Sequence, residues 1–150
     1  MIELDLDLDP LLVELACNMA MEAVEALKQQ PDDRFVSTDP EDPDLAEAWA
    51  QGLREELNRD FKTLTDFFSS GRLGKEPIHL SLEHAEELLR ACSAVRFWVR
   101  THRLALVSDE DLETGGVRLD ELDPDTQIGY FTYGLLAYVQ ESLIDLLSEA

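Results

Sequence analysis

Three arginines near the middle of the chain have the spacing of one helical stripe. Arg96, Arg100 and Arg103 are separated by four and three residues, so on a helix they lie within a sector of about 60°. A guanidinium group forms planar, paired hydrogen bonds with a carboxylate or a phosphate. The stripe therefore predicts either a site that binds an anion or an acidic partner, or an internal match to carboxylates of the same chain.

Acidic residues at helical spacing raise the question of a metal site. A di-iron site in a helical bundle requires Glu-x-x-His on two helices, but Glu76 and His79 lie in a proline-containing, extended segment. A calcium loop starting at Asp109 would have Thr114 in place of the turn glycine and Asp120 in place of the bidentate glutamate. We predict neither a metal site nor a cofactor.

One carboxylate pattern suggests an enzyme. Glu22-x-x-Glu25 and Glu56-x-x-x-Asp60 loosely resemble the magnesium ligands of helical nucleotide pyrophosphohydrolases. Such spacings arise by chance in a chain with 33 acidic residues. The common signatures of nucleophilic, nucleotide-binding and zinc chemistry are absent from the sequence. We therefore predict no catalytic residue and keep the magnesium-dependent hydrolase as an alternative function.

Charge is unevenly distributed along the chain. The 33 acidic and 12 basic residues give a net charge of -21. Residues 1–60 carry 17 acidic and 4 basic residues, residues 61–107 carry 5 and 7, and residues 108–150 carry 11 and 1. This excess of negative charge opposes binding to nucleic acid or to an anionic membrane. It also raises a second alternative, an acidic mimic of DNA that occupies a basic protein.

Four long segments with apolar residues at helical spacing would position these side chains. Aspartate followed by proline, which supplies an N-cap and a first helical residue, starts three of them, and Ser81 is predicted to cap the other. We expect helices over residues 10–29, 43–69, 82–104 and from 124 onward, with a short helix between Ser108 and Gly115.

Two short segments have the pattern of strands. The first nine residues alternate between apolar and acidic side chains, and residues 77–80 form a second extended candidate. A two-stranded ribbon is marginally stable alone, so it would have to lie on the helices. The fold class predicted for residues 1–150 is a single acidic, mainly α domain, like a four-helix bundle with a small two-stranded β appendage.

Several positions carry predictions about packing. Phe35 and Val36 are expected to attach the loop over residues 31–43 to the core, and Phe97 to widen the apolar face of the third long helix. Gly129 and Gly134 each cost the last helix about 1 kcal/mol relative to alanine. Close packing against another helix is the expected compensation at both positions.

The two cysteines and the first residues bear on the compartment. Cys17 and Cys92 each lie in an apolar helical stretch, where a free cysteine usually packs as a small hydrophobe. The start of the chain lacks the basic flank and apolar run of a signal peptide, and no apolar run approaches the roughly 20 residues that span a bilayer. We therefore expect a cytoplasmic protein with reduced thiols and no membrane span.

Several stretches of the C-terminal half form a pattern of their own. They are Leu80-x-x-Glu83-x-Ala85, Leu89-Arg90-Ala91, Val95-Arg96-Phe97, Asp109-Glu110-Asp111, Tyr133 and Tyr138-Val139-Gln140-Glu141-Ser142-Leu143. This pattern resembles an uncharacterised bacterial family best known from actinobacteria. Ser93-Ala94 stands where Asn-Asp is usual, and Leu135 and Tyr138 replace a tryptophan pair. Members are often encoded beside the Clp protease adaptor, so the resemblance implies a link to Clp-type proteolysis. It also directs attention to Arg96, Gln140 and Glu141.

The sequence predicts a non-enzymatic, cytoplasmic interaction or regulatory protein whose partner is an unidentified protein. The lack of catalytic signatures and the arginine stripe motivate this prediction. A binding role would place the site at Arg96, Arg100 and Arg103, and no nucleic-acid or membrane partner is expected.

Overall fold

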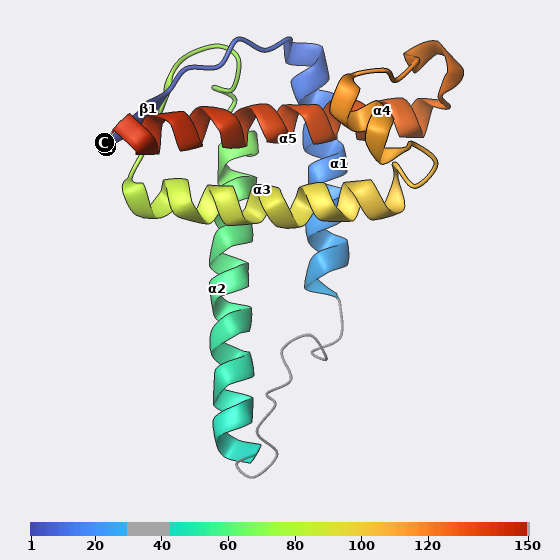
Figure 1. The fold of residues 1–150 in the computed structure, drawn as a ribbon. Coiled ribbons are helices and arrows are strands. Elements are labelled where there is room, and N and C mark those ends of the chain that lie inside the picture. Colours follow the sequence, from blue (N-terminus) through green and yellow to red (C-terminus); the bar gives the residue numbers. More distant parts are fainter. Residues whose placement is uncertain (30–42, 150) are drawn as a thin grey trace.

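The computed structural model describes residues 1–29 and 43–149, in which the four long helices form two crossed layers (Figure 1). Helices α3 (Leu82–His102) and α5 (Pro124–Glu149) run antiparallel in one layer. Helices α1 (Pro10–Lys28) and α2 (Pro43–Ser69) cross them in the other. The predicted mainly helical fold is confirmed. Among the helices described, none combines the length and the apolar character needed to cross a bilayer.

The predicted β appendage is also present. Strand β1 (Ile2–Leu4) pairs antiparallel with β2 (Ile78–Leu80), with Glu3 opposite His79. In both strands the outer two side chains are buried and the middle one is exposed. The paired part of the first strand is much shorter than its nine-residue alternation, because β2 offers only three residues as a partner.

Helix starts are held by the predicted caps. Asp9 Oδ1 accepts a hydrogen bond of 2.8 Å from the Leu11 amide at the start of α1, and Ser81 Oγ accepts one of 3.1 Å from the His84 amide at the start of α3. Ser108 caps the short helix α4 (Asp109–Thr114) in the same way. A 3-10 helix over Leu119–Glu121 follows. Helix α3 ends at His102, two residues earlier than predicted.

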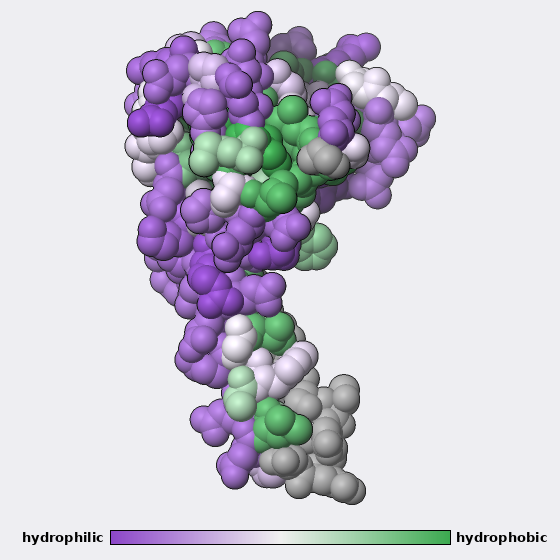
Figure 2. All heavy atoms as spheres, turned by 90° about the vertical axis from the view of Figure 1, so that its left-hand side faces the viewer, coloured by the Kyte–Doolittle hydropathy of each residue, from purple (hydrophilic) through white to green (hydrophobic). Residues whose placement is uncertain are grey.

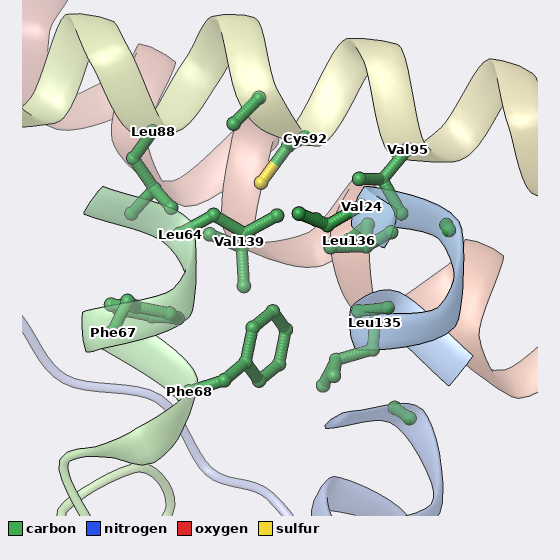
Figure 3. Packing of buried hydrophobic residues seen from close by; sticks show 14 of the residues in the cluster. Val24, Leu64, Phe67, Phe68, Leu88, Cys92, Val95, Leu135, Leu136 and Val139 are labelled. Atoms are coloured by element: carbon green, nitrogen blue, oxygen red, sulfur yellow. The ribbon is translucent and has the colours of Figure 1, made fainter. Parts of the chain in front are cut away.

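The hydrophobic core lies between the two layers. Figure 3 shows side chains of α2, α3 and α5 meeting there, with Leu64 and Val139 side by side below Cys92 and with Phe68 below them. Ala20, Ala23 and Val24 supply the face of α1 that enters the core. The aliphatic side chains of β1 and β2 cover one end of it, which explains why so short a sheet persists.

The apolar residues at helical spacing are not all buried. Every buried residue of α2 lies from Asp60 onward, whereas Leu45 and Trp49 are exposed. Helix α2 crosses the other layer only with its C-terminal part (Figure 1), and Figure 2 shows apolar side chains on the projecting part. Phe97 is 74% exposed on the outer face of α3. The predicted contacts of Phe35 and Val36 lie outside the described residues.

The two glycines of α5 differ in their surroundings. A Cβ atom on Gly129 would lie 2.9 Å from Arg103 Cβ, so close helix packing is confirmed there. A Cβ atom on Gly134 would meet nothing within 4 Å, and Gly134 is exposed. The prediction of close packing at Gly134 is therefore wrong.

Candidate functional site: a groove beside Arg96

Two arginines of the stripe are engaged within the chain. Arg100 Nη2 lies 2.6 Å from Asp109 Oδ1, which joins α3 to α4. Arg103 pairs with Glu22 of α1, and its guanidinium carbon lies 4.8 Å from the centroid of the Trp98 ring. For these two side chains the structure shows the internal charge match, which ties α1 and α4 to the end of α3.

Arg96 has different surroundings. Its Nη1 donates a hydrogen bond of 2.7 Å to Gln140 Oε1, and its guanidinium carbon lies 4.5 Å from the Tyr133 ring centroid. Among the described residues, no carboxylate forms an ion pair with it, and its buried Nε has no hydrogen-bond partner. An unpaired buried donor costs about 1–3 kcal/mol. Arg96 is thus the arginine of the stripe that has an anchored position and an unused charge.

Gln140 determines where Arg96 points. Its Nε2 donates to the Leu89 carbonyl at 3.0 Å and to Ser93 Oγ at 2.7 Å. A carbonyl can only accept, so the amide nitrogen must face α3 and the amide oxygen is left for Arg96. Gln140 is buried. The contact between α3 and α5 therefore holds one edge of the guanidinium, while Tyr133 covers one of its faces.

A groove opens beside Arg96 with a volume of about 590 Å³. Its walls come from the segment before α1, the first turn of α1, α4 and α5, and apolar and aromatic side chains predominate. The lining residues are Leu8, Asp9, Leu12, Val13, Arg96, Leu112, Glu113, Tyr130, Phe131, Tyr133, Gly134, Leu135, Ala137, Tyr138 and Glu141. Known ligand pockets have volumes of about 300–1,000 Å³ and mostly apolar walls with a few polar groups. We refer to this feature as the Arg96 groove.

Three carboxylates share the groove with the single guanidinium. Asp9 ends the segment before α1, Glu113 belongs to α4 and Glu141 to α5, and all three are exposed. None of them pairs with Arg96 in the described structure. The Arg96 groove therefore combines one cationic group, apolar walls and an acidic rim.

Three of the four carboxylates that suggested a hydrolase pair with arginines. Arg90 of α3 forms two hydrogen bonds of 3.0 Å with Asp60 and lies 3.8 Å from Glu56. Glu22 is paired with Arg103. Within residues 1–29 and 43–149, no group of three or more histidine, cysteine, aspartate or glutamate residues could hold a metal ion.

Burial disfavours the thiolate form of both cysteines. Cys92 is fully buried, and burial raises the pKa of its thiol to about 12, although the positive charge of Arg96 acts in the opposite direction. Burial, with a smaller effect of Glu14, also raises the pKa of the half-buried Cys17. Both cysteines are free, as predicted.

Most of the Arg96 groove was not predicted from the sequence. Leu12 lies at an apolar position of the amphipathic helix α1 but is 38% exposed on the groove wall. The signal that could have revealed it is the set of aromatic residues on more than one face of α5, since Tyr130, Tyr133 and Tyr138 all line the groove.

The family profile of a domain of unknown function, DUF2017, matches residues 3–147. The chain belongs to this family. The DUF2017 match covers the N-terminal helices as well as the C-terminal half on which the resemblance rested, so both walls of the Arg96 groove lie within the family domain. No curated protein and no solved structure matches the chain.

Proposed function

We propose that the protein is a non-enzymatic interaction or regulatory protein, and that its partner protein places a carboxylate on Arg96. The observation that carries the proposal is the contrast within α3. Arg90, Arg100 and Arg103 each have a carboxylate partner, whereas Arg96 has none among the described residues.

The surplus of acid in the chain makes this contrast informative. With 33 acidic and 12 basic residues, an internal partner for any arginine would be easy to supply. Arg96 instead faces an open groove with apolar walls. Interface cores are enriched in tyrosine and arginine, and the groove has both. These features favour a binding role for Arg96 over a purely structural role in which the arginine merely lacks a carboxylate partner.

The test is capture of the partner from the native cytoplasm at moderate salt with the full chain immobilised. Arg96→Gln should reduce recovery of a stoichiometric partner by about 10-fold or more, because a hydrogen bond to a charged group contributes about 1.5–3 kcal/mol. Arg96→Lys keeps the charge but loses the planar fork, so it should restore recovery only in part.

The matched control is Arg72→Gln. It removes the same charge from an exposed side chain that pairs with Glu76 on the surface at 3.1 Å. Thermal melting of both variants checks that they fold. Equal recovery of the partner by the wild type and a folded Arg96→Gln variant would refute the proposal.

We further propose that this role belongs to Clp-type proteolysis in the cytoplasm. The link to proteolysis rests on the resemblance alone, and the free cysteines support a reducing compartment. The test is the degradation rate of a Clp substrate with purified protease and adaptor, measured with and without this protein. An unchanged rate at stoichiometric excess would contradict the link.

A further inference from the structure

The Arg96 groove favours a ligand that carries a single negative charge. Asp9, Glu113 and Glu141 place three carboxylates around one guanidinium. A phosphate or a nucleic-acid strand would add several negative charges to a surface that is already acidic. A ligand that carries one carboxylate and, some distance away, one cationic group would instead pair with Arg96 through the first and with the acidic rim through the second.

Arg96 keeps one accessible donor for a carboxylate. Gln140 occupies Nη1 and Tyr133 covers one face of the guanidinium. Nε has no hydrogen-bond partner but is buried, whereas Nη2 makes no hydrogen bond with a described residue and is not fully buried. Nη2 is therefore the nitrogen that offers a charged hydrogen bond to a carboxylate oxygen of a ligand.

The groove walls require an apolar group next to that carboxylate. Leu12, Val13 and Tyr138 line the groove together with Arg96, and Gly134 fills none of its space because glycine has no side chain. At the end of a protein chain, the carboxylate and the last side chain are attached to the same carbon. A volume of about 590 Å³ suits such a chain end, since it has the size of a pocket for a small ligand.

We infer that the Arg96 groove binds the C-terminal segment of a partner protein. The terminal carboxylate lies on Arg96, an apolar last side chain fills the groove, and a basic side chain upstream meets the acidic rim. This inference rests on the proposed function and specifies which part of the partner enters the site. Charge complementarity on both sides of the ligand carries it.

The experiment uses the immobilised full-length protein to select binders from a library of short random peptides that are displayed with free C-termini. Selected peptides should share an apolar last residue with a basic residue before it. The consensus peptide is then synthesised as a free acid and as an amide, and binding is measured by fluorescence anisotropy. Amidation should weaken binding about 10- to 100-fold, because it removes the charged acceptor.

Gly134→Leu tests whether the groove itself is occupied. The new side chain would begin in open space on the groove wall, since a Cβ atom at Gly134 meets nothing within 4 Å. Affinity for the free-acid peptide should fall about 10-fold or more. Gly52→Leu is the matched control, because Gly52 is equally exposed within α2 and equally free of neighbours among the described residues. It should leave affinity unchanged.

The outcomes separate this inference from the proposed function. If the free-acid and amide peptides bind equally well, and both lose binding in Arg96→Gln, the chain-end inference is overturned. The proposed function, in which some carboxylate of the partner binds Arg96, then still stands. Binding that survives Arg96→Gln would overturn both. A selection without a C-terminal consensus, or a free amino acid that binds as tightly as the peptide, would overturn the inference alone.

Discussion

Alanine substitutions at the two glycines of α5 are expected to change stability in opposite directions. Both remove the cost of glycine in a helix, about 1 kcal/mol. At Gly134 nothing opposes this gain, because a Cβ atom there meets nothing within 4 Å. At Gly129 the new atom would lie 2.9 Å from Arg103 Cβ and 3.5 Å from Leu104 Cδ2. The first distance is well below the separation of about 3.5–4.0 Å that carbon atoms prefer.

The difference between the two variants isolates the packing cost, since the gain in helix propensity is common to both. Overpacking costs about 1–3 kcal/mol. The free energy of unfolding of Gly129→Ala should therefore be about 1–3 kcal/mol lower than that of Gly134→Ala. Arg103 Cβ is close to the backbone and cannot swing away as the end of a long side chain can. Its displacement would also disturb the ion pair with Glu22.

Urea unfolding followed by circular dichroism measures these differences. Gly134→Ala should raise the free energy of unfolding by about 1 kcal/mol, which corresponds to roughly 2–4 °C in melting temperature for a chain of this size. Gly52→Ala should give the same gain, because its surroundings are equally open. If Gly129→Ala proved as stable as Gly134→Ala, the close crossing of α5 over the end of α3 would be refuted.

Three further substitutions have expected outcomes. Asp60→Asn removes the charge that Arg90 binds through two hydrogen bonds of 3.0 Å, so urea melts should show a loss of about 1–3 kcal/mol. Gln140→Leu should preserve helix content by circular dichroism but abolish binding of the free-acid peptide, because Arg96 loses the acceptor of its Nη1. Burial raises the pKa of Cys92 to about 12, so the folded protein retains a proton that the unfolded chain loses. Stability should therefore fall above pH 9.0, the ordinary pKa of the thiol, by about 1.4 kcal/mol per pH unit, and Cys92→Ala should reduce this slope in urea melts.

Two of these substitutions have a control variant, and each has an outcome that would contradict it. Lys62→Met breaks an exposed pair with Asp66 at 2.9 Å and should cost at most about 1 kcal/mol; a loss as large as that of Asp60→Asn would contradict the role given to burial. Cys17→Ala should change the alkaline slope less than Cys92→Ala, and identical slopes in all three proteins would count against the buried thiol. Unchanged peptide affinity in Gln140→Leu would mean that Tyr133 alone positions Arg96.

The local structure of this chain could be predicted from the sequence with good accuracy. Asp9 and Ser81 cap their helices through hydrogen bonds to amides two and three residues away, so their effect depends on neighbouring residues only. The pairing of the two short strands was also predicted, because each offers apolar side chains on one face. The membership of an uncharacterised family was predicted from residues of α3 and α5 and is confirmed for residues 3–147.

The site depended on contacts between distant parts of the chain. The spacing of Arg96, Arg100 and Arg103 placed them on one stripe, but it could not tell which of them pair with a carboxylate of the same chain. Only the tertiary structure distinguishes them, because Glu22 of α1 and Asp109 of α4 reach two of the three. Arg96 is left to Gln140, 44 positions further along the chain.

The arginine stripe was therefore determined by the sequence, whereas the fold decided which of its arginines pair with a carboxylate and which does not. Helical spacing follows from the repeat of the backbone, which is the same in every helix. Which carboxylate meets which guanidinium follows from how helices cross, and crossing depends on the packing of side chains from four segments at once. The Arg96 groove exists for the same reason, since its walls come together only when α1, α4 and α5 pack around the same residue of α3.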